Sequence, residues 1–359
     1  MKKKIINIVG IVFLGLAAVL TYAYFQYNTF LKQPIVVTAD NSIFSVKPGS
    51  NLAQVATQLE SKGIIQDSRW FELYGRVSGK AHQLKAGEYK LENGVLPDAL
   101  LSKLTSGQTI QYQLTILEGK TYKDIMAAVK QHPQLKQTLT DADYVNIMAK
   151  VGGAAGMSPE GWFLPDTYNF PRNTTDLEFL QRSYKAMQTY LQKAWEKREP
   201  TTVLRTPYDA LILASIVEKE TGLPEERPLV ARVFLNRLER GMLLQTDPSV
   251  IYGMGDKYTG NIRKTDLQTD TPYNTYTRKG LTPTPIATPS KAAIDAVLHP
   301  SNSKVIYFVA TTPGGASKFS ETLDEHNRAV QQYILNRNKA ATPVTPVAAP
   351  AANPAAAQP

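Results

Sequence analysis

The longest apolar stretch of the chain runs from Ile5 to Phe25 and carries no charged residue. About twenty helical residues cross a hydrocarbon core of roughly 30 Å, so the pattern predicts a transmembrane helix over residues 5–25. Three lysines precede the stretch and the next one is Lys32, which places residues 1–4 in the cytoplasm and the remainder outside. A cleaved signal peptide is the alternative, but Tyr22-Ala23-Tyr24 is a poor cleavage site.

Apolar residues recur at helical spacing in many shorter segments, and glycine or a polar turn ends most of them. Between these segments lie short runs rich in β-branched and aromatic residues. The pattern predicts an α+β fold with helices over residues 52–62, 70–77, 97–104, from 122, 138–150, 176–197, 225–240, 290–298 and 323–338. It predicts strands near residues 44–46, 87–91 and 305–310, the last of them buried.

The helix predicted between Thr206 and Gly222 is the best defined. Thr206 suits the N-cap, Pro207 the first helical position, and Asp209 lies three residues after the cap. Gly222 can take the left-handed conformation that ends a helix. Residues 210–217 are apolar except for Ser215, which predicts a helix buried on all sides.

Glu218 follows directly after this apolar stretch. A carboxyl group at the end of a buried helix is poorly hydrated, which favours the protonated form that donates a proton near neutral pH. The alternative is a structural pairing with Lys219, Arg227 or Arg232. Glu220 lies two positions further on, hence on another face, and is expected at the surface.

Several segments lack periodicity and combine aromatic, polar and proline residues. We expect ordered loops over residues 160–170, 243–255, 271–276 and 281–289, because long irregular loops in a compact domain usually have a function. Their hydroxyls and amides suit the recognition of sugar hydroxyls, and aromatic rings suit stacking on pyranose rings. Ordinary surface loops remain the alternative.

A weak internal repeat links Phe44-Ser-Val-Lys-Pro-Gly to Leu114-Thr-Ile-Leu-Glu-Gly, and a helical pattern follows each copy. The first copy resembles LysM modules, which bind cell-wall glycan, through its strand, Pro-Gly turn and helix. The resemblance implies a LysM-like module over residues 40–110. Chance similarity is the alternative, because strand, turn and helix form a common unit.

The composition of the chain limits the kinds of site that it can form. The chain has 359 residues, a net charge of +9 and no cysteine, so neither disulfides nor thiolate metal sites are possible. Its four histidines lie far apart, and we expect neither a metal site nor a cofactor.

The net positive charge favours binding to a phospholipid surface or to an anionic polymer such as cell wall over binding to nucleic acid, because no basic block with interleaved aromatics is present. Residues 339–359 are nearly all Ala, Pro, Thr and Val and are expected to be disordered.

A candidate buried acid among polar and aromatic loops suits glycoside cleavage, where protonation of the leaving oxygen is the main task. Most glycosidases need a second carboxylate. Asp247 and Asp166 are the candidates, and the sequence places neither of them relative to Glu218.

The chain resembles the endolytic murein transglycosylase family (MltG, or YceG-like) over about residues 5–335. The motifs that carry the resemblance are Glu160-Gly-Trp-Phe-Leu-Pro-Asp-Thr-Tyr, Ala214-Ser-Ile-Val-Glu-Lys-Glu-Thr, Arg232-Val-Phe-Leu-Asn-Arg-Leu, Leu244-Gln-Thr-Asp-Pro-Ser-Val-Ile-Tyr-Gly, Tyr273-Asn-Thr-Tyr, Gly280-Leu-Thr-Pro-Thr-Pro-Ile and Phe319-Ser. It implies a catalytic domain over residues 111–338.

The resemblance further implies a single-pass enzyme of the bacterial inner membrane, with its catalytic part in the periplasm. Such a lyase cuts nascent peptidoglycan between N-acetylmuramic acid (MurNAc) and N-acetylglucosamine (GlcNAc), which ends strand elongation. The essential glutamate of the family falls on Glu218, which would act first as acid and then as base. The muramyl C6 hydroxyl attacks the anomeric carbon, so no second carboxylate is needed.

The matched loops supply further candidates for substrate binding: Gln245, Asp247, Tyr252, Asn274 and Tyr276. Asp247 could instead cap a helix or turn beginning at Pro248. Replacing Asn274 with alanine is expected to lower turnover more than stability. Expected partners are peptidoglycan strands, the bilayer through residues 5–25, and penicillin-binding-protein synthases. Two alternatives remain open, namely a non-catalytic wall-binding scaffold and a two-carboxylate muramidase.

Overall fold

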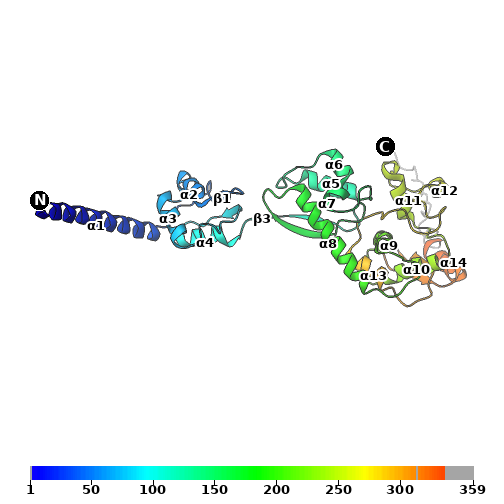
Figure 1. Ribbon diagram of the computed structural model, residues 1–359. Coiled ribbons are helices and arrows are strands. Elements are labelled where there is room, and N and C mark those ends of the chain that lie inside the picture. Colours follow the sequence, from blue (N-terminus) through cyan, green and yellow to red (C-terminus); the bar gives the residue numbers. More distant parts are fainter. Residues whose placement is uncertain (1, 313, 336–359) are drawn as a thin grey trace, which may run out of the picture. The chain divides into compact units, whose positions relative to one another are not determined.

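The structure, a computed structural model, describes residues 2–312 and 314–335, which form two compact units. Within these residues the first unit comprises 2–115, 128–140 and 167–179, and the second comprises 116–127, 141–166 and 180–335. Both units mix helices with short two-stranded sheets, so the α+β prediction holds at that level (Figure 1).

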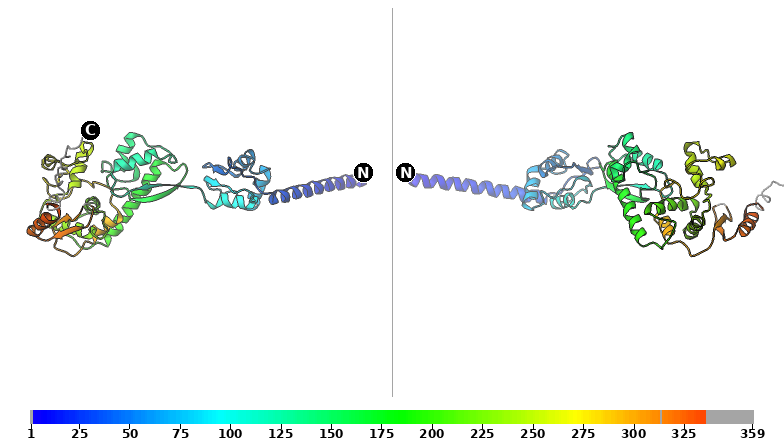
Figure 2. Two further views of the ribbon diagram at one scale, coloured as in Figure 1. Left: turned by 180° about the vertical axis from the view of Figure 1, so that it is seen from behind. Right: turned by 45° about the vertical axis from the view of Figure 1, so that its right-hand side comes forward.

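The first unit begins with one uninterrupted helix, α1 (Lys2–Lys32), which projects from the remainder of the unit (Figure 2). Residues 7–32 are long and apolar enough to cross a membrane, judged by length and composition. The helix continues past the predicted end at Phe25, since no helix breaker occurs before Pro34. Phe30 at its end is 5% exposed and belongs to the core of the first unit.

Two strands and three helices build the body of the first unit. Strand β1 (Ile43–Val46) pairs antiparallel with β2 (Gly87–Lys90), and the helices are α2 (Leu52–Ser61), α3 (Ser68–Val77) and α4 (Pro97–Ser106). The apolar positions that predicted them form the core, where Val55, Leu59, Phe71 and Leu101 are fully buried. The likeness of this region to a LysM module stays a prediction.

The two copies of the weak repeat share local structure. Strand β3 (Gln111–Ile116) leads through Gly119 into α5 (Tyr122–Gln131), as β1 leads through Gly49 into α2. Both glycines have positive φ, 69° and 79°. Strand β3 pairs with β4 (Asp166–Pro171), so the prediction of an irregular loop over residues 160–170 was wrong in its second half. Tyr168 and Phe170 are buried and alternate with exposed residues, as in a half-buried strand.

The helix predicted over residues 138–150 is divided in the second unit. Its parts are α6 (Asp141–Val145) and α7 (Ile147–Val151), because Asn146 leaves the helical conformation with φ −107° and ψ 26°. The long helix α8 (Asp176–Glu196) matches its prediction within one residue.

Three helices form the centre of the second unit: α9 (Pro207–Glu220), α10 (Arg227–Glu239) and α13 (Lys291–Leu298) (Figure 1). Helix α9 packs against the other two, and residues 210–217 are all buried, as predicted. Thr206 and Asp209 form the expected capping box. The predicted stop at Gly222 was wrong. Thr221 ends the helix in an extended conformation, and its hydroxyl accepts a hydrogen bond from Leu223 N at 3.1 Å.

Short helices replace parts of the predicted loops. These are α11 (Asp247–Met254), the 3-10 turn η1 (Gly255–Lys257) and α12 (Lys264–Gln268). A helix does begin here, but its N-cap is Thr246 and Asp247 is its first residue, so the alternative prediction that Asp247 caps the helix was wrong. Residues 271–276 and 281–289 are irregular, as predicted.

The second unit ends with a hairpin of β5 (Tyr307–Ala310) and β6 (Ser317–Ser320), followed by α14 (Leu323–Val330) and the π-helical turn η2 (Gln331–Leu335). Strand β5 is partly exposed, not buried as predicted, because a sheet of only two strands leaves much of its surface uncovered. The predicted tail over residues 339–359, Met1, and the last three residues of the predicted final helix lie outside the described residues.

Candidate active site

Glu218 lies in the last turn of α9, and its side chain is 6% exposed. Its Oε2 atom accepts two hydrogen bonds from Ser290, one from the backbone N at 2.9 Å and one from Oγ at 2.5 Å. Its Oε1 atom lies 3.6 Å from Nη2 of Arg227, beyond normal hydrogen-bond distance. One carboxylate oxygen is therefore fully engaged, whereas the other has a single cationic neighbour.

The backbone that leads to Ser290 is fixed by hydrogen bonds to α9 and to the turn before α5. Ile286 N donates to Ser215 Oγ at 2.9 Å, and Gly119 N donates to Thr288 O at 2.8 Å. Thr288 N donates in return to Lys120 O at 2.7 Å. These contacts prevent the Ser290 donors from drifting away from the carboxyl group.

Gly119 lies directly beside the acid. A Cβ atom on this residue would lie 3.9 Å from Glu218 Cγ, and its φ of 69° is strained for any other residue. Lys219 Nζ donates to Gly119 O at 3.3 Å. The glycine therefore lets the turn before α5 pass close to the end of α9.

The three basic residues that could have paired with Glu218 differ in what they contact. Lys219 contacts Gly119, and Arg232 Nε donates to Ser301 O at 2.6 Å. Only Arg227 faces the carboxyl group, and its side chain is 10% exposed. Within the described residues its Nε atom is buried without a hydrogen-bond partner, so the guanidinium group retains a free donor close to Glu218.

Three of the predicted binding residues lie at the start of α11 and in the facing loop. Tyr276 OH donates to Asp247 Oδ1 at 2.5 Å. Gln245 is exposed, has a positive φ of 49°, and donates its backbone N–H to Thr275 O at 3.1 Å. These residues present a carboxylate, an amide and a phenol at one partly exposed place.

Tyr252 belongs to a different cluster, on the C-terminal half of α11. Its hydroxyl donates to Glu160 Oε2 at 3.1 Å, and its ring packs edge-on against Tyr273 at 4.9 Å. Glu160 Oε1 also accepts the backbone N–H of Tyr122 at 2.9 Å. Tyr252 is therefore already engaged with a buried carboxyl group.

Asn274 is buried inside the protein, which the polar composition of its loop did not predict. It is fully buried, and its Nδ2 atom donates to the carbonyl oxygens of Asp266, Leu267 and Thr269 at 3.3, 3.0 and 2.6 Å. Its Oδ1 atom accepts the N–H of Tyr276 at 2.8 Å. With its amide group used in this way, Asn274 has no surface to offer a sugar and instead holds the loop.

Two further acids have pKa values raised by burial, and sequence reasoning missed both. Burial raises the pKa of Glu160 to about 7, although the donors Tyr122 N and Tyr252 OH act in the opposite direction. Burial likewise raises the pKa of Glu220 to about 7; a hydrogen bond from Thr246 Oγ1 lowers it, and the nearby charge of Asp247 raises it. Glu220 was expected at the surface and is partly buried, because Thr246 in the segment before α11 contacts its carboxyl group.

The fold and the site together define an α+β protein whose central buried helix ends in one tightly held carboxyl group. Among the described residues, no group of three or more His, Cys, Asp or Glu side chains could hold a metal ion. The model of the YceG-like family matches residues 44–332, and the chain therefore belongs to this family.

Curated relatives are named after an activity. A protein of Bacillus subtilis (strain 168) named endolytic murein transglycosylase is 32% identical over 335 residues, which cover 88% of this chain and 91% of the relative. A protein of the same name from Streptococcus pneumoniae serotype 2 is 29% identical over 349 residues, with 88% of this chain and 63% of the relative covered.

A solved structure supports the family fold. A crystal structure at 2.6 Å of a YceG-like protein from Listeria monocytogenes aligns with a TM-score of 0.50 and 30% sequence identity. The alignment covers 80% of this chain and 97% of that chain.

Proposed function

We propose that this protein is a membrane-anchored endolytic lytic transglycosylase that cleaves the MurNAc–GlcNAc bond within nascent peptidoglycan strands. The observation that carries the proposal is the burial of Glu218 with one engaged and one available oxygen. The names of the curated relatives support the reaction class and the substrate. Helix α1 supports the anchor. The three lysines before its apolar stretch support a cytoplasmic position for residues 1–4 and a catalytic part outside the membrane.

The two carboxyl oxygens of Glu218 make different contacts and are therefore assigned different roles. Oε2 accepts both Ser290 donors, so Oε1 is the atom that would hold the mobile proton. Oε1 gives that proton to the glycosidic oxygen as the bond to the MurNAc anomeric carbon breaks, and GlcNAc leaves with a hydroxyl group. Oε1 then takes the proton of the muramyl C6 hydroxyl as the C6 oxygen bonds to the anomeric carbon.

Both proton transfers use the same atom, so the residue returns to its starting state and no water is consumed. Between the two steps Glu218 is negatively charged and buried, which is costly without compensation. The Arg227 guanidinium group, 3.6 Å away, supplies that compensation and can move closer when the charge develops. We assign Arg227 the role of stabilising the intermediate carboxylate.

The exposed group of Gln245, Asp247 and Tyr276 is proposed to bind the glycan. A carboxylate, an amide and a phenolic hydroxyl are suited to hydrogen bonds with sugar hydroxyls. Release of strands by such an enzyme would end their elongation, and penicillin-binding-protein synthases are the proposed partners.

The test is the digestion of purified nascent glycan strands by the detergent-solubilised protein, with mass spectrometry of the products. The wild-type protein should release 1,6-anhydro-MurNAc ends, and Glu218→Gln should release none while its circular dichroism spectrum stays unchanged. Glu225→Gln, at an exposed position, is the matched control and should retain activity. A non-catalytic scaffold would produce no new glycan ends with any variant, whereas a muramidase would produce reducing ends in place of 1,6-anhydro ends.

A further inference from the structure

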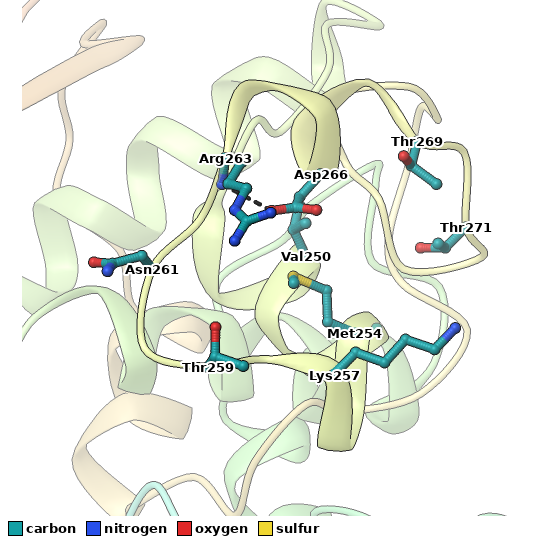
Figure 3. A pocket seen from close by; sticks show the side chains of 10 residues that line it. Val250, Met254, Lys257, Thr259, Asn261, Arg263, Asp266, Thr269 and Thr271 are labelled. Carbon is teal, nitrogen blue, oxygen red and sulfur yellow. Dashed lines mark hydrogen bonds between the residues drawn. The ribbon is translucent and has the colours of Figure 1, made fainter.

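A cavity of about 310 Å³ lies in the second unit between α11 and residues 257–271 (Figure 3). Val250 and Met254 line it from α11, and polar side chains line the remainder. None of these lining residues is used in the proposed proton transfers. The volume is near the lower end of the range for small-ligand sites, roughly 300–1,000 Å³.

The wall of the cavity is held in place from behind. The buried Asn274 amide donates to three carbonyl groups in the segment that forms this wall, those of Asp266, Leu267 and Thr269. At the start of α12, Arg263 N donates to Asp266 Oδ2 at 2.8 Å (Figure 3). A wall fixed by a fully buried side chain favours a preformed site.

The lining presents an excess of hydrogen-bond donors and of positive charge. Lys257 and Arg263 contribute two cations and Asp266 one carboxylate, which gives a net charge of +1 for the lining. Within the described residues neither Lys257 nor Arg263 makes an ion pair, and the buried Thr271 Oγ1 atom has no hydrogen-bond partner. Thr259, Asn261 and Thr269 add further polar groups around the opening (Figure 3). Such a lining suits a carboxylate with neighbouring amide groups.

We propose that this cavity binds the carboxylate-bearing peptide stem attached to MurNAc, an inference that rests on the proposed function. The sugar rings of the strand are uncharged, whereas the stems carry free carboxylates and amides. The cavity volume suits one or two amino-acid residues better than a disaccharide. Helix α11 connects the two regions, because Asp247 at its start belongs to the proposed glycan-binding group and Met254 at its end lines the cavity. A stem branching from a bound strand could thus be recognised by the same helix.

The test compares glycan strands that carry stems with strands from which an amidase has removed them and whose freed lactyl carboxylates have then been converted to amides, so that the bare strands carry no carboxylate. The full-length wild-type protein should have a KM about tenfold lower for strands with stems, the effect of one charge-assisted hydrogen bond. Lys257→Ala and Arg263→Ala should each lose that preference and keep the wild-type kcat and the wild-type KM on bare strands. Lys264→Ala is the matched control, since this exposed lysine on α12 does not line the cavity.

A second readout does not depend on catalysis. A soluble stem pentapeptide titrated into the full-length protein should bind, and amidation of its carboxylates or either cavity substitution should weaken binding about tenfold. Equal KM values for both kinds of strand, together with no peptide binding, would overturn the proposal. If the wild-type protein cleaves neither substrate, the proposed function fails, and the peptide titration alone then decides for or against the cavity.

Discussion

The hydroxyl group of Ser290 makes two separate hydrogen bonds, one to the proposed catalytic acid and one to the first turn of α13. Its Oγ atom donates to Glu218 Oε2 at 2.5 Å and accepts the N–H of Ala293 at 3.1 Å, as the N-cap of α13. The residue is 1% exposed, so water cannot replace either contact. In Ser290→Ala both contacts are lost, while the backbone N–H that donates to Glu218 at 2.9 Å remains.

The size of the effect follows from these two contacts. Loss of an N-cap costs about 0.5–2 kcal/mol, and a hydrogen bond to a neutral carboxyl group, the resting form proposed for Glu218, contributes about 0.5–1.5 kcal/mol. Since one atom makes both contacts, the two contributions overlap, and we expect the free energy of unfolding to fall by about 1–3 kcal/mol. The carboxyl group keeps one of its two fixed donors, so kcat should fall by about tenfold, not to zero.

Urea unfolding at pH 7 measures the first effect, and the rate of anhydro-end release measures the second. Ser290→Thr restores the hydroxyl group and should recover most of both. Thr322→Ala is the matched control, because Thr322 caps α14 in the same way without contacting Glu218. It should lower stability and leave kcat unchanged. A wild-type kcat in Ser290→Ala would refute the claim that this hydroxyl group positions the acid.

Three further outcomes are expected. Because the pKa of Glu160 is about 7 in the fold and ordinarily 4.5, its stabilising contribution is complete below pH 4.5 and lost by pH 7. Glu160→Gln should therefore be more stable than wild type at pH 8, by at most about 3 kcal/mol, and not at pH 4; parallel melting curves would contradict this. Asn274→Ala should lower the free energy of unfolding by about 1–3 kcal/mol, since it leaves buried carbonyl groups unpaired; an unchanged urea midpoint would restore the direct-contact hypothesis. Gly119→Ala should cost about 1–2 kcal/mol through its φ and also lower kcat, whereas Gly49→Ala, equally strained, should leave kcat unchanged.

Local patterns predicted much of the central helix. The cap at Thr206, the proline at its first position and the apolar run to Val217 are all properties of neighbouring residues, and all are confirmed. The burial of Glu218 followed from the same run. Its most important partner did not, because Ser290 lies 72 positions away and only the folded chain brings the two together.

The wrong predictions have a common cause, namely that composition does not distinguish a polar group facing solvent from one satisfied inside the protein. Asn274 was a candidate for substrate binding and is fully buried, with every contact of its amide group made to the backbone. Glu220 was placed at the surface by helical geometry alone, which takes no account of the contact that Thr246 makes with its carboxyl group. The buried acid at Glu160 was obscured in the same way, within a segment interpreted as a loop.

The central claim, that Glu218 alone transfers the proton in both directions, is tested most directly by cleavage in water enriched in oxygen-18. We predict 1,6-anhydro ends without label from the wild-type protein, because the attacking oxygen belongs to the sugar. Reducing ends that carry the heavy oxygen would contradict the claim, since they require water as the nucleophile and a second group to activate it.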